Sequence, residues 1–224
     1  MTGIFDSGVG GLTALKHLRR LKPDEDICYY ADERNAPYGS KSERRIMELV
    51  KKDIDLLRRA GCERILAACC TASAVIPKLP EKYREGVTAI IDPTAEEAVR
   101  LTDGRVGVIA TEATVRCGAF ESAIKRLDNG IQVASLAAQP LVAMVESGDR
   151  DGCCTEECRE YLSLLSSGLG DIDLLILGCT HFTHLEKTIA DVFGVMAISP
   201  SVIGAQRIAE GITCRGAGKT VIYK

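Results

Sequence analysis

The sequence lacks three features that would place the protein in a membrane, outside the cell or on nucleic acid. No apolar stretch approaches the roughly 20 residues that a membrane-spanning helix needs. The N-terminus runs directly into Thr2–Asp6, without the basic and apolar regions of a signal peptide. The 28 Lys and Arg are scattered among 31 Asp and Glu, for a net charge of −3, and form no basic stripe. We therefore expect a cytoplasmic protein with neither a membrane nor a nucleic acid as partner.

Low-complexity tracts and long linkers are absent as well. Hydrophobic residues make up 46% of the chain and charged residues 26%, an ordinary globular balance that argues against disorder. A chain of 224 residues suffices for one large α/β domain or for two small ones, each with its own core.

Ten cysteines stand out against these absences. In a reducing compartment they rarely form disulfides, which leaves core packing, metal binding or reactive thiols as their roles. Cys153, Cys154 and Cys158 lie close in sequence, but without C-x-x-C spacing or a nearby histidine, so we expect no metal site there. Four others have strand or helix contexts that suit a small buried residue, and are predicted to be structural: Cys28, Cys62, Cys117 and Cys214.

Short β-branched or apolar runs alternate with longer segments of helical periodicity. Ile46, Val50, Ile54 and Leu57, for example, recur at three- and four-residue spacing, which predicts an amphipathic helix. Alternation of this kind builds a mainly parallel sheet with helices on both faces. Strands are predicted at Thr2–Phe5, Ile27–Ala31, Arg64–Ala68, Val87–Ile91, Val106–Ala110, Gln132–Leu136, Leu174–Leu177, Val195–Ile198 and Thr220–Tyr223.

Two segments of the chain share one plan. Residues 65–71 (ILAACCT) and 174–180 (LLILGCT) each contain an apolar strand that ends in a small residue, then cysteine, then a threonine that opens a helix. Ligands of open α/β sheets bind beyond the carboxyl ends of the strands. Cys69 and Cys179 are therefore predicted to meet a ligand from two sides, each near a helix N-terminus that favours its thiolate.

A matched pair of thiols suits racemisation at the Cα of an amino acid. That reaction removes a proton from one face and returns one to the other, and two groups of similar pKa do this in both directions. The alternative is that both cysteines are buried packing residues, which fits one such cysteine better than a matched pair.

Breaks in the pattern near Ile91–Pro93 and Ser199–Pro200 indicate domain boundaries. We predict an α/β fold of two similar lobes, with mainly parallel sheets flanked by helices and the active site in the cleft between the lobes. The first lobe comprises residues 1–91 plus 199–224 and carries Cys69. The second comprises residues 92–198 and carries Cys179.

A glycine-rich turn, Asp6–Gly11, follows the first predicted strand and opens a helix. Glycines there let the backbone approach a ligand, and free N–H groups suit a carboxylate or phosphate. The turn lacks the Lys-Ser/Thr ending of a P-loop and the full G-x-G-x-x-G spacing, so a nucleotide role is disfavoured. A simple tight turn between strand and helix remains the alternative.

Four motifs, in order, closely resemble those of glutamate racemases, in the aspartate/glutamate racemase superfamily. They are Gly3–Gly11 (GIFDSGVGG), Ala31-Asp32 through Pro37–Ser40 (PYGS), Cys69–Ala74 (CCTASA) and Gly178–Phe182 (GCTHF). The resemblance runs from residue 3 to about residue 210. Residues 111–115 and 140–148 look like two further segments of that family.

The resemblance implies residue roles and a reaction. Cys69 and Cys179 match the two catalytic cysteines, Asp6 an acid that supports the first thiol, and His181 and Glu146 groups that support the second. Asp6 as a helix cap and Glu146 as a solvated helical residue are the alternatives. Positions that match substrate-binding residues are Ser7, Pro37, Tyr38, Gly39, Cys70, Thr71, Thr114 and Thr180.

The same resemblance implies cofactor-independent conversion of L-glutamate to D-glutamate for cell-wall peptidoglycan, with no metal and no pyridoxal phosphate, and family members are often homodimers. The chain departs from the family at Cys70, where asparagine is usual, and at Thr183, where proline is usual. Racemisation of aspartate or another amino acid, and a lapsed enzyme that only binds amino acids, therefore stay open as alternatives.

Overall fold

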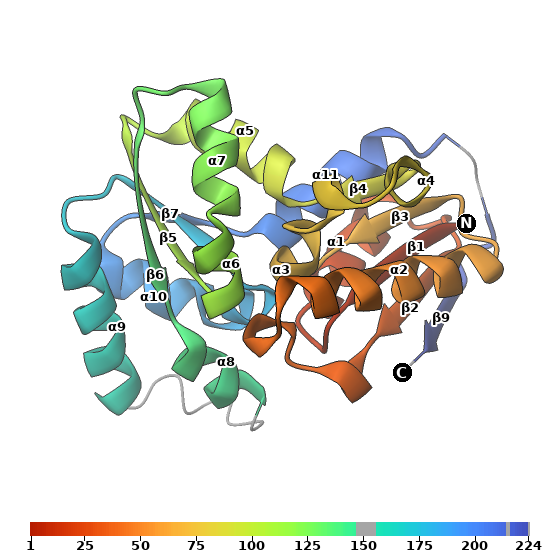
Figure 1. The fold of residues 1–224 in the computed structure, drawn as a ribbon, viewed down its shortest axis with the longest axis horizontal. Coiled ribbons are helices and arrows are strands. Elements are labelled where there is room, and N and C mark those ends of the chain that lie inside the picture. The colour runs from red at the N-terminus through yellow and green to blue at the C-terminus, as the bar shows by residue number, and fades with distance from the viewer. Residues whose placement is uncertain (147–155, 214–215, 224) are drawn as a thin grey trace.

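The computed structural model describes residues 1–146, 156–213 and 216–223, which form two separate parallel sheets, each flanked by helices (Figure 1). The first sheet has the strand order β4-β3-β1-β2-β9, and the second has the order β6-β5-β7-β8. The strands are β1 (Thr2–Asp6), β2 (Ile27–Ala31), β3 (Arg64–Ala67), β4 (Val87–Ala89), β5 (Arg105–Ala110), β6 (Gln132–Ala137), β7 (Leu174–Gly178), β8 (Met196–Ile198) and β9 (Thr220–Tyr223). The predicted fold class is confirmed.

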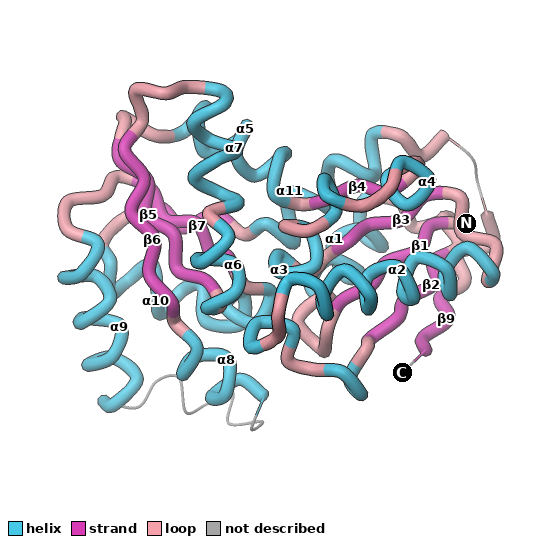
Figure 2. Tube along the Cα trace, viewed as in Figure 1, coloured by secondary structure: helices cyan, strands magenta, loops and turns pink. Residues whose placement is uncertain are grey.

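Helices cover both sheets and connect successive strands (Figure 2). The α-helices are α1 (Leu12–Leu21), α2 (Glu43–Arg59), α3 (Cys70–Ser73), α4 (Glu81–Arg84), α5 (Ile91–Leu101), α6 (Glu112–Cys117), α7 (Ala119–Leu127), α8 (Gln139–Glu146), α9 (Glu156–Leu169), α10 (Glu186–Phe193) and α11 (Pro200–Glu210). Short 3-10 helices are η1 (Glu33–Asn35), η2 (Tyr38–Ser40), η3 (Ile76–Lys78) and η5 (Thr180–Leu185).

The core of the first sheet follows from the alternation of side chains along its strands. On β1, Ile4 belongs to the apolar cluster that contains Leu18 of α1, whereas its neighbour Phe5 belongs to the cluster that contains Leu49 and Leu57 of α2. Both faces of the strand are thus buried, as expected for a parallel sheet between two helical layers.

Each predicted strand forms, with shifts of one or two residues at some ends. The largest difference is at β4, which ends at Ala89 instead of Ile91. Ile91 begins α5, with Pro93 in the first turn of this helix, where a missing N–H costs no hydrogen bond. The apolar run in the sequence extends beyond β4 because Ile91, the first residue of α5, is buried as well.

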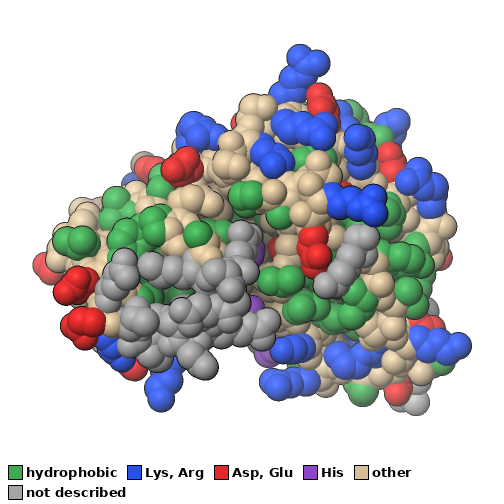
Figure 3. All heavy atoms as spheres, turned by 90° about the horizontal axis from the view of Figure 1, so that it is seen from below, with side chains coloured by type: hydrophobic (Ala, Val, Ile, Leu, Met, Phe, Trp, Pro, Cys, Tyr) green, Lys and Arg blue, Asp and Glu red, His purple; other side chains and the backbone are tan. Residues whose placement is uncertain are grey.

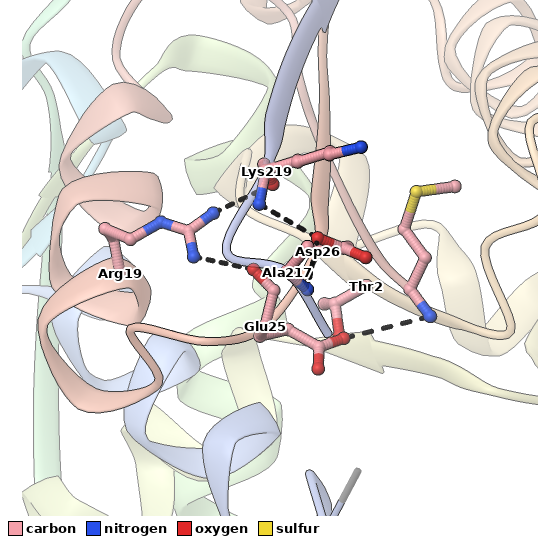
Figure 4. A network of polar contacts seen from close by, with 7 residues as sticks. Thr2, Arg19, Glu25, Asp26, Ala217 and Lys219 are labelled. Atoms are coloured by element: carbon pink, nitrogen blue, oxygen red, sulfur yellow. Dashed lines mark hydrogen bonds and ion pairs between the residues drawn. The ribbon is translucent and has the colours of Figure 1, made fainter. Parts of the chain in front are cut away.

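The last strand of the first sheet, β9, is held by a polar network (Figure 4). Arg19 of α1 donates to the carbonyls of Glu25 and Lys219 and to Thr220 Oγ1. Asp26 Oδ1 accepts hydrogen bonds from the backbone N–H groups of Ala217 and Lys219. Residues from opposite ends of the sequence thus complete one sheet.

The described cysteines are free thiols. Cys28 and Cys62 are buried and Cys117 is half-buried, in keeping with a packing role, whereas Cys214 lies outside the described residues. Cys158 is buried in α9, and the predictions for Cys153 and Cys154 fall outside the described residues. Within the described part of the chain, no group of three or more His, Cys, Asp or Glu is arranged to hold a metal ion.

The surface carries charges of both signs. On the face shown in Figure 3, Lys and Arg side chains are spread over the described part, with Asp and Glu among them. Among the described helices, none combines the length and the apolar character needed to cross a membrane.

Candidate active site

Cys69 and Cys179 each follow the carboxyl end of a parallel strand, one in each sheet. Cys69 comes after β3 and precedes α3, and Cys179 comes directly after β7 and precedes η5. Both line one small cavity of about 10 Å³, roughly the space of a single water molecule. Its lining residues are Ser7, Pro37, Tyr38, Gly39, Cys69, Cys70, Thr71, Thr111, Val142, Cys179, Thr180 and His181.

The environment of Cys69 disfavours its charged form. The thiol is only 5% exposed, and burial together with the negative charge of Asp6 raises its pKa to about 11. Ser7 Oγ lies 3.4 Å from Cys69 Sγ and opposes this shift. The backbone N–H of Ala72 in α3 favours the thiolate, as predicted for a helix N-terminus, but burial and Asp6 outweigh it and the pKa is raised.

Cys179 is paired with the imidazole of His181. Cys179 Sγ lies 3.5 Å from His181 Nδ1, and both side chains are buried. Burial, with a smaller contribution from the charge of His184, lowers the pKa of His181 to about 4. His181 is therefore a neutral imidazole at pH 7, and it offers the thiol a polar partner without a positive charge.

Asp6 ends β1 and links it to the second sheet. Its buried carboxylate accepts a hydrogen bond from Thr180 Oγ1 at 3.1 Å and another from the backbone N–H of Gly8 at 3.0 Å. The N-cap residue of α1 is Gly11, and no side chain caps this helix. The alternative of Asp6 as a helix cap is therefore wrong, since its carboxylate fixes the turn and the threonine beside Cys179.

The glycines of this turn permit contacts within the protein. A Cβ on Gly10 would lie 2.3 Å from Thr180 Oγ1, and one on Gly11 would lie 2.6 Å from the Cβ of Asp6. At Gly39 a Cβ would lie 2.6 Å from the Cβ of Thr111. The prediction that glycines of the Asp6–Gly11 turn let the backbone approach a ligand stays a prediction. In this structure the missing Cβ atoms make room for the side chains of Thr180, Asp6 and Thr111.

Three threonine hydroxyls form a closed cluster at the edge of the cavity. Thr71, Thr111 and Thr114 have Oγ1 atoms 3.0 to 3.1 Å apart in all three pairs. Thr71 and Thr111 line the cavity, whereas Thr114 is not among the lining residues and contacts the hydroxyls of both. The sequence-predicted Thr114 is therefore one residue removed from the cavity, in the part of the chain that the structure describes.

Sequence reasoning missed Thr111 and Val142 as lining residues. Thr111 directly follows β5 and caps α6, so the strand-end rule that selected the cysteines applies to it as well. Val142 of α8 carries no chemical signal in the sequence. Glu146 is the last residue of the same helix, and its side chain lies outside what the structure describes.

Cys70 lies beside Cys69 and also lines the cavity. It is 2% exposed, and burial, followed by the charge of Cys179, raises its pKa well above the ordinary value of a thiol. Cys70 therefore presents a neutral thiol at the position where the family's asparagine would present an amide.

The wall formed by Pro37, Tyr38 and Gly39 is anchored by the Tyr38 phenol. This side chain is fully buried, and its oxygen lies 2.6 Å from Asp32 Oδ2 and 2.8 Å from Asp53 Oδ2. Asp53, on α2, was not a predicted site residue.

Comparison with known proteins identifies the family of the chain. A family model for Asp/Glu/hydantoin racemases matches residues 16–208. The glutamate racemase of Desulforudis audaxviator is 41% identical over 204 residues, which cover 89% of this chain and 74% of that protein. The glutamate racemase of Aquifex aeolicus is 35% identical over 224 residues, 99% of this chain and 87% of that protein.

Solved structures extend the likeness to three dimensions. The glutamate racemase of Francisella tularensis, solved in complex with D-glutamate, has a TM-score of 0.90 to this chain at 29% sequence identity. The match covers 99% of this chain and 86% of that one. The chain therefore belongs to the Asp/Glu/hydantoin racemase family, and it is an amino-acid racemase.

Proposed function

We propose that the chain interconverts L- and D-glutamate without a cofactor, by proton transfer between two thiols. The observation that carries the proposal is that Cys69 and Cys179, from two different sheets, line one small cavity. The relatives named as glutamate racemases, at 41% and 35% identity, support glutamate as the substrate.

In the proposed reaction, the thiolate of Cys69 takes the proton from Cα of one enantiomer and becomes a thiol. The thiol of Cys179 then gives its proton to the opposite face of the same carbon and becomes a thiolate. The roles are exchanged in the reverse direction, so each turnover conserves protons between enzyme and substrate.

The carbanion formed at Cα is strongly basic, so the developing charge on the α-carboxylate needs fixed donors. The hydroxyls of Ser7 and Thr71 line the cavity and can donate to a carboxylate without adding a competing base. Thr180 also lines the cavity, and because its hydroxyl donates to Asp6, we assign its backbone to the substrate site. We assign Pro37, Tyr38, Gly39, Cys70 and Thr114 to the walls and support of the same substrate site. We assign Asp6 to the environment of the first thiol, where its charge favours the protonated form, and His181 to the support of the second thiol. The same role for Glu146 stays a prediction from the resemblance.

The test is incubation of L-glutamate in heavy water. We expect deuterium at Cα of the D-glutamate product, and a loss of racemisation of about 10²- to 10⁴-fold in both Cys69→Ser and Cys179→Ser. Cys117→Ser is the matched control, since Cys117 donates to the Thr114 carbonyl outside the cavity and a hydroxyl keeps that bond. Product without solvent deuterium, or full activity in either active-site variant, would refute the proposal.

Two alternatives are separated by related measurements. Cys70 in place of an amide leaves aspartate or another amino acid as a rival substrate, and a panel of enantiopure amino acids ranks them by kcat/KM. A protein that only binds amino acids exchanges no Cα proton with heavy water.

We also propose that the two sheets mark two lobes, residues 1–91 plus 199–224 and residues 92–198. The support is that β1 to β4 and β9 form one sheet, β5 to β8 form the other, and α11 packs against α1.

Supply of D-glutamate for peptidoglycan is the proposed role. The cytoplasm is the proposed compartment, because the reaction needs reduced thiols. The homodimer stays a prediction, which analytical ultracentrifugation tests.

A further inference from the structure

A buried acid outside the cavity contacts the residue that anchors one of its walls. Asp53 lies on α2 and is 2% exposed, and its Oδ2 is 2.8 Å from the phenol oxygen of Tyr38. The same oxygen lies 2.6 Å from Asp32 Oδ2, and Asp32 is also 2% exposed. One phenol is thus held between two carboxyl groups away from water.

The number of protons limits which hydrogen bonds can form. A phenol has one hydrogen, so Tyr38 can donate to only one of the two carboxyl groups. Asp32 already accepts hydrogen bonds from Tyr30 and Asn35 through its other oxygen, so its contacts use it as an acceptor. Tyr38 donating to Asp32 then requires that Asp53 carry its own proton and donate to the phenol oxygen.

We propose that Asp53 is a positioning residue for the cavity: its protonated carboxyl donates to Tyr38 and thereby fixes the Pro37–Gly39 wall. The expected effect on KM rests on the racemisation proposed above, whereas the expected effect on the backbone of the Pro37–Gly39 wall does not. Gly39 lies directly against Thr111 of the second sheet, with no room for a Cβ, so a shift of this wall changes the cavity.

The surroundings of Asp53 favour the proton at and below neutral pH. Burial raises the pKa of Asp53 to about 7, and the negative charges of Asp32 and Asp6 act in the same direction. The hydrogen bond from Tyr38 and the charge of Lys52 oppose the shift but do not cancel it. The titratable and charged groups that face Asp53 are Tyr38 from η2, Asp32 from the loop after β2, Tyr30 from β2, Asp6 from β1 and Lys52 from α2.

Above pH 7, Tyr38, Asp32 and Asp53 have one hydrogen between them for two hydrogen bonds. Burial and the two nearby carboxylates raise the pKa of Tyr38 far above its ordinary range, so the phenol keeps its hydrogen and Asp53 ionises instead. Two carboxylates then compete for one phenolic hydrogen, and the anchor of the wall weakens.

The first experiment measures the wall without catalysis. Backbone amide exchange of residues 36–41 is compared between wild type and Asp53→Asn at pH 6 and at pH 8.5. An asparagine side chain donates to Tyr38 at both pH values, because it does not titrate. We expect equal exchange at pH 6 and several-fold faster exchange in the wild type at pH 8.5. Equal exchange of the two proteins at both pH values would overturn the proposal.

The second experiment measures KM and kcat for glutamate between pH 6.5 and 8.5. We expect the wild-type KM to rise several-fold relative to that of Asp53→Asn, with kcat within about twofold. Tyr38→Phe removes the anchor and should have a raised KM at every pH. Asp55→Asn is the matched control, since Asp55 lies on the same helix as Asp53 but accepts from Tyr83 of α4, and this variant should keep the wild-type profile.

The two proposals fail separately. If glutamate is not racemised but exchange at residues 36–41 depends on Asp53 and pH as described, only the proposed function falls. If glutamate is racemised and Asp53→Asn matches the wild type in both experiments, the role of Asp53 is wrong.

Discussion

At the scale of single residues, Cys69 is subject to opposing influences. Its position after a strand brings it to the cavity, but burial and Asp6 raise its pKa to about 11, so the free thiol dominates at pH 7. A substrate ammonium group in the cavity would bring a positive charge close to the sulfur and favour the thiolate. In the proposed reaction, we therefore expect the thiolate of Cys69 to form when the substrate binds.

This environment predicts a pH dependence for the substrate-free protein. Because the thiolate is the reactive form and the pKa of Cys69 lies above the range, alkylation of Cys69 by iodoacetamide should accelerate about tenfold per pH unit from pH 7 to 9.5. Mass spectrometry of the peptide that contains Cys69 gives the rate, with Cys69→Ser to identify the modified sulfur. A rate that levels off below pH 9 would mean that burial does not control this thiol.

Cys70 yields a second prediction at this scale. Cys70→Asn adds an amide donor and acceptor to the cavity wall, and one added hydrogen bond of about 1 kcal/mol should lower KM for glutamate by about fivefold. Cys70→Ala, which adds no polar group, should leave KM unchanged or higher. Kinetics with both enantiomers of glutamate and aspartate provide the measurement. An unchanged KM in Cys70→Asn would show that the thiol position does not contact substrate.

Residues with chemistry at strand ends could be predicted from the sequence, whereas their supports could not. Cys69, Cys179 and Thr180 follow apolar strands, and the structure brings them to one cavity. The position of Asp53 in the sequence does indicate a buried acid. It lies on the buried stripe of α2 between Val50 and Ile54, and an acid on an apolar stripe needs a buried partner.

At the scale of elements, the parallel sheets were predictable because short β-branched or apolar runs alternate with segments of helical periodicity. The pairing of these strands was not, since β9 reaches β2 across most of the sequence. The type of helix after each cysteine could not be predicted either. Cys179 is followed by the 3-10 helix η5, and Cys69 is followed by a single α-turn. The argument from helix dipoles depended on that detail.

The close packing of the turn between β1 and α1 predicts the effect of replacing one of its glycines by alanine. In Gly10→Ala the new Cβ meets Thr180 at 2.3 Å, so the turn and η5 must separate. We expect the free energy of unfolding to fall by about 1–3 kcal/mol and kcat/KM to fall at least tenfold. Urea unfolding and racemisation assays measure the two effects.

Gly8→Ala controls for the change of residue type in the same turn. A Cβ on Gly8 lies 3.8 Å from the ring of His181, an ordinary contact, so this variant should stay near wild type in both assays. Equal losses in Gly8→Ala and Gly10→Ala would assign the effect to glycine flexibility and not to contact with Thr180.

At the scale of the whole molecule, the cavity of about 10 Å³ between the two sheets is far too small for an amino acid. We therefore expect the sheets and their helices to move apart and close again when an amino acid binds. Small-angle X-ray scattering should show a larger radius of gyration for the substrate-free protein than for the protein saturated with glutamate. Sodium chloride at equal ionic strength is the control. A radius that glutamate leaves unchanged would contradict opening by relative motion of the sheets.

The position of β9 has a consequence for biosynthesis. Its residues follow all of the second sheet in the sequence, and the contact between Arg19 and Lys219 spans 200 residues. On the ribosome, β2 is translated long before this partner and keeps an open edge while the second sheet is made. Unpaired strand edges are sites of misassociation in nascent chains. The edge of β2 therefore stays open to misassociation until residues 217–223 arrive.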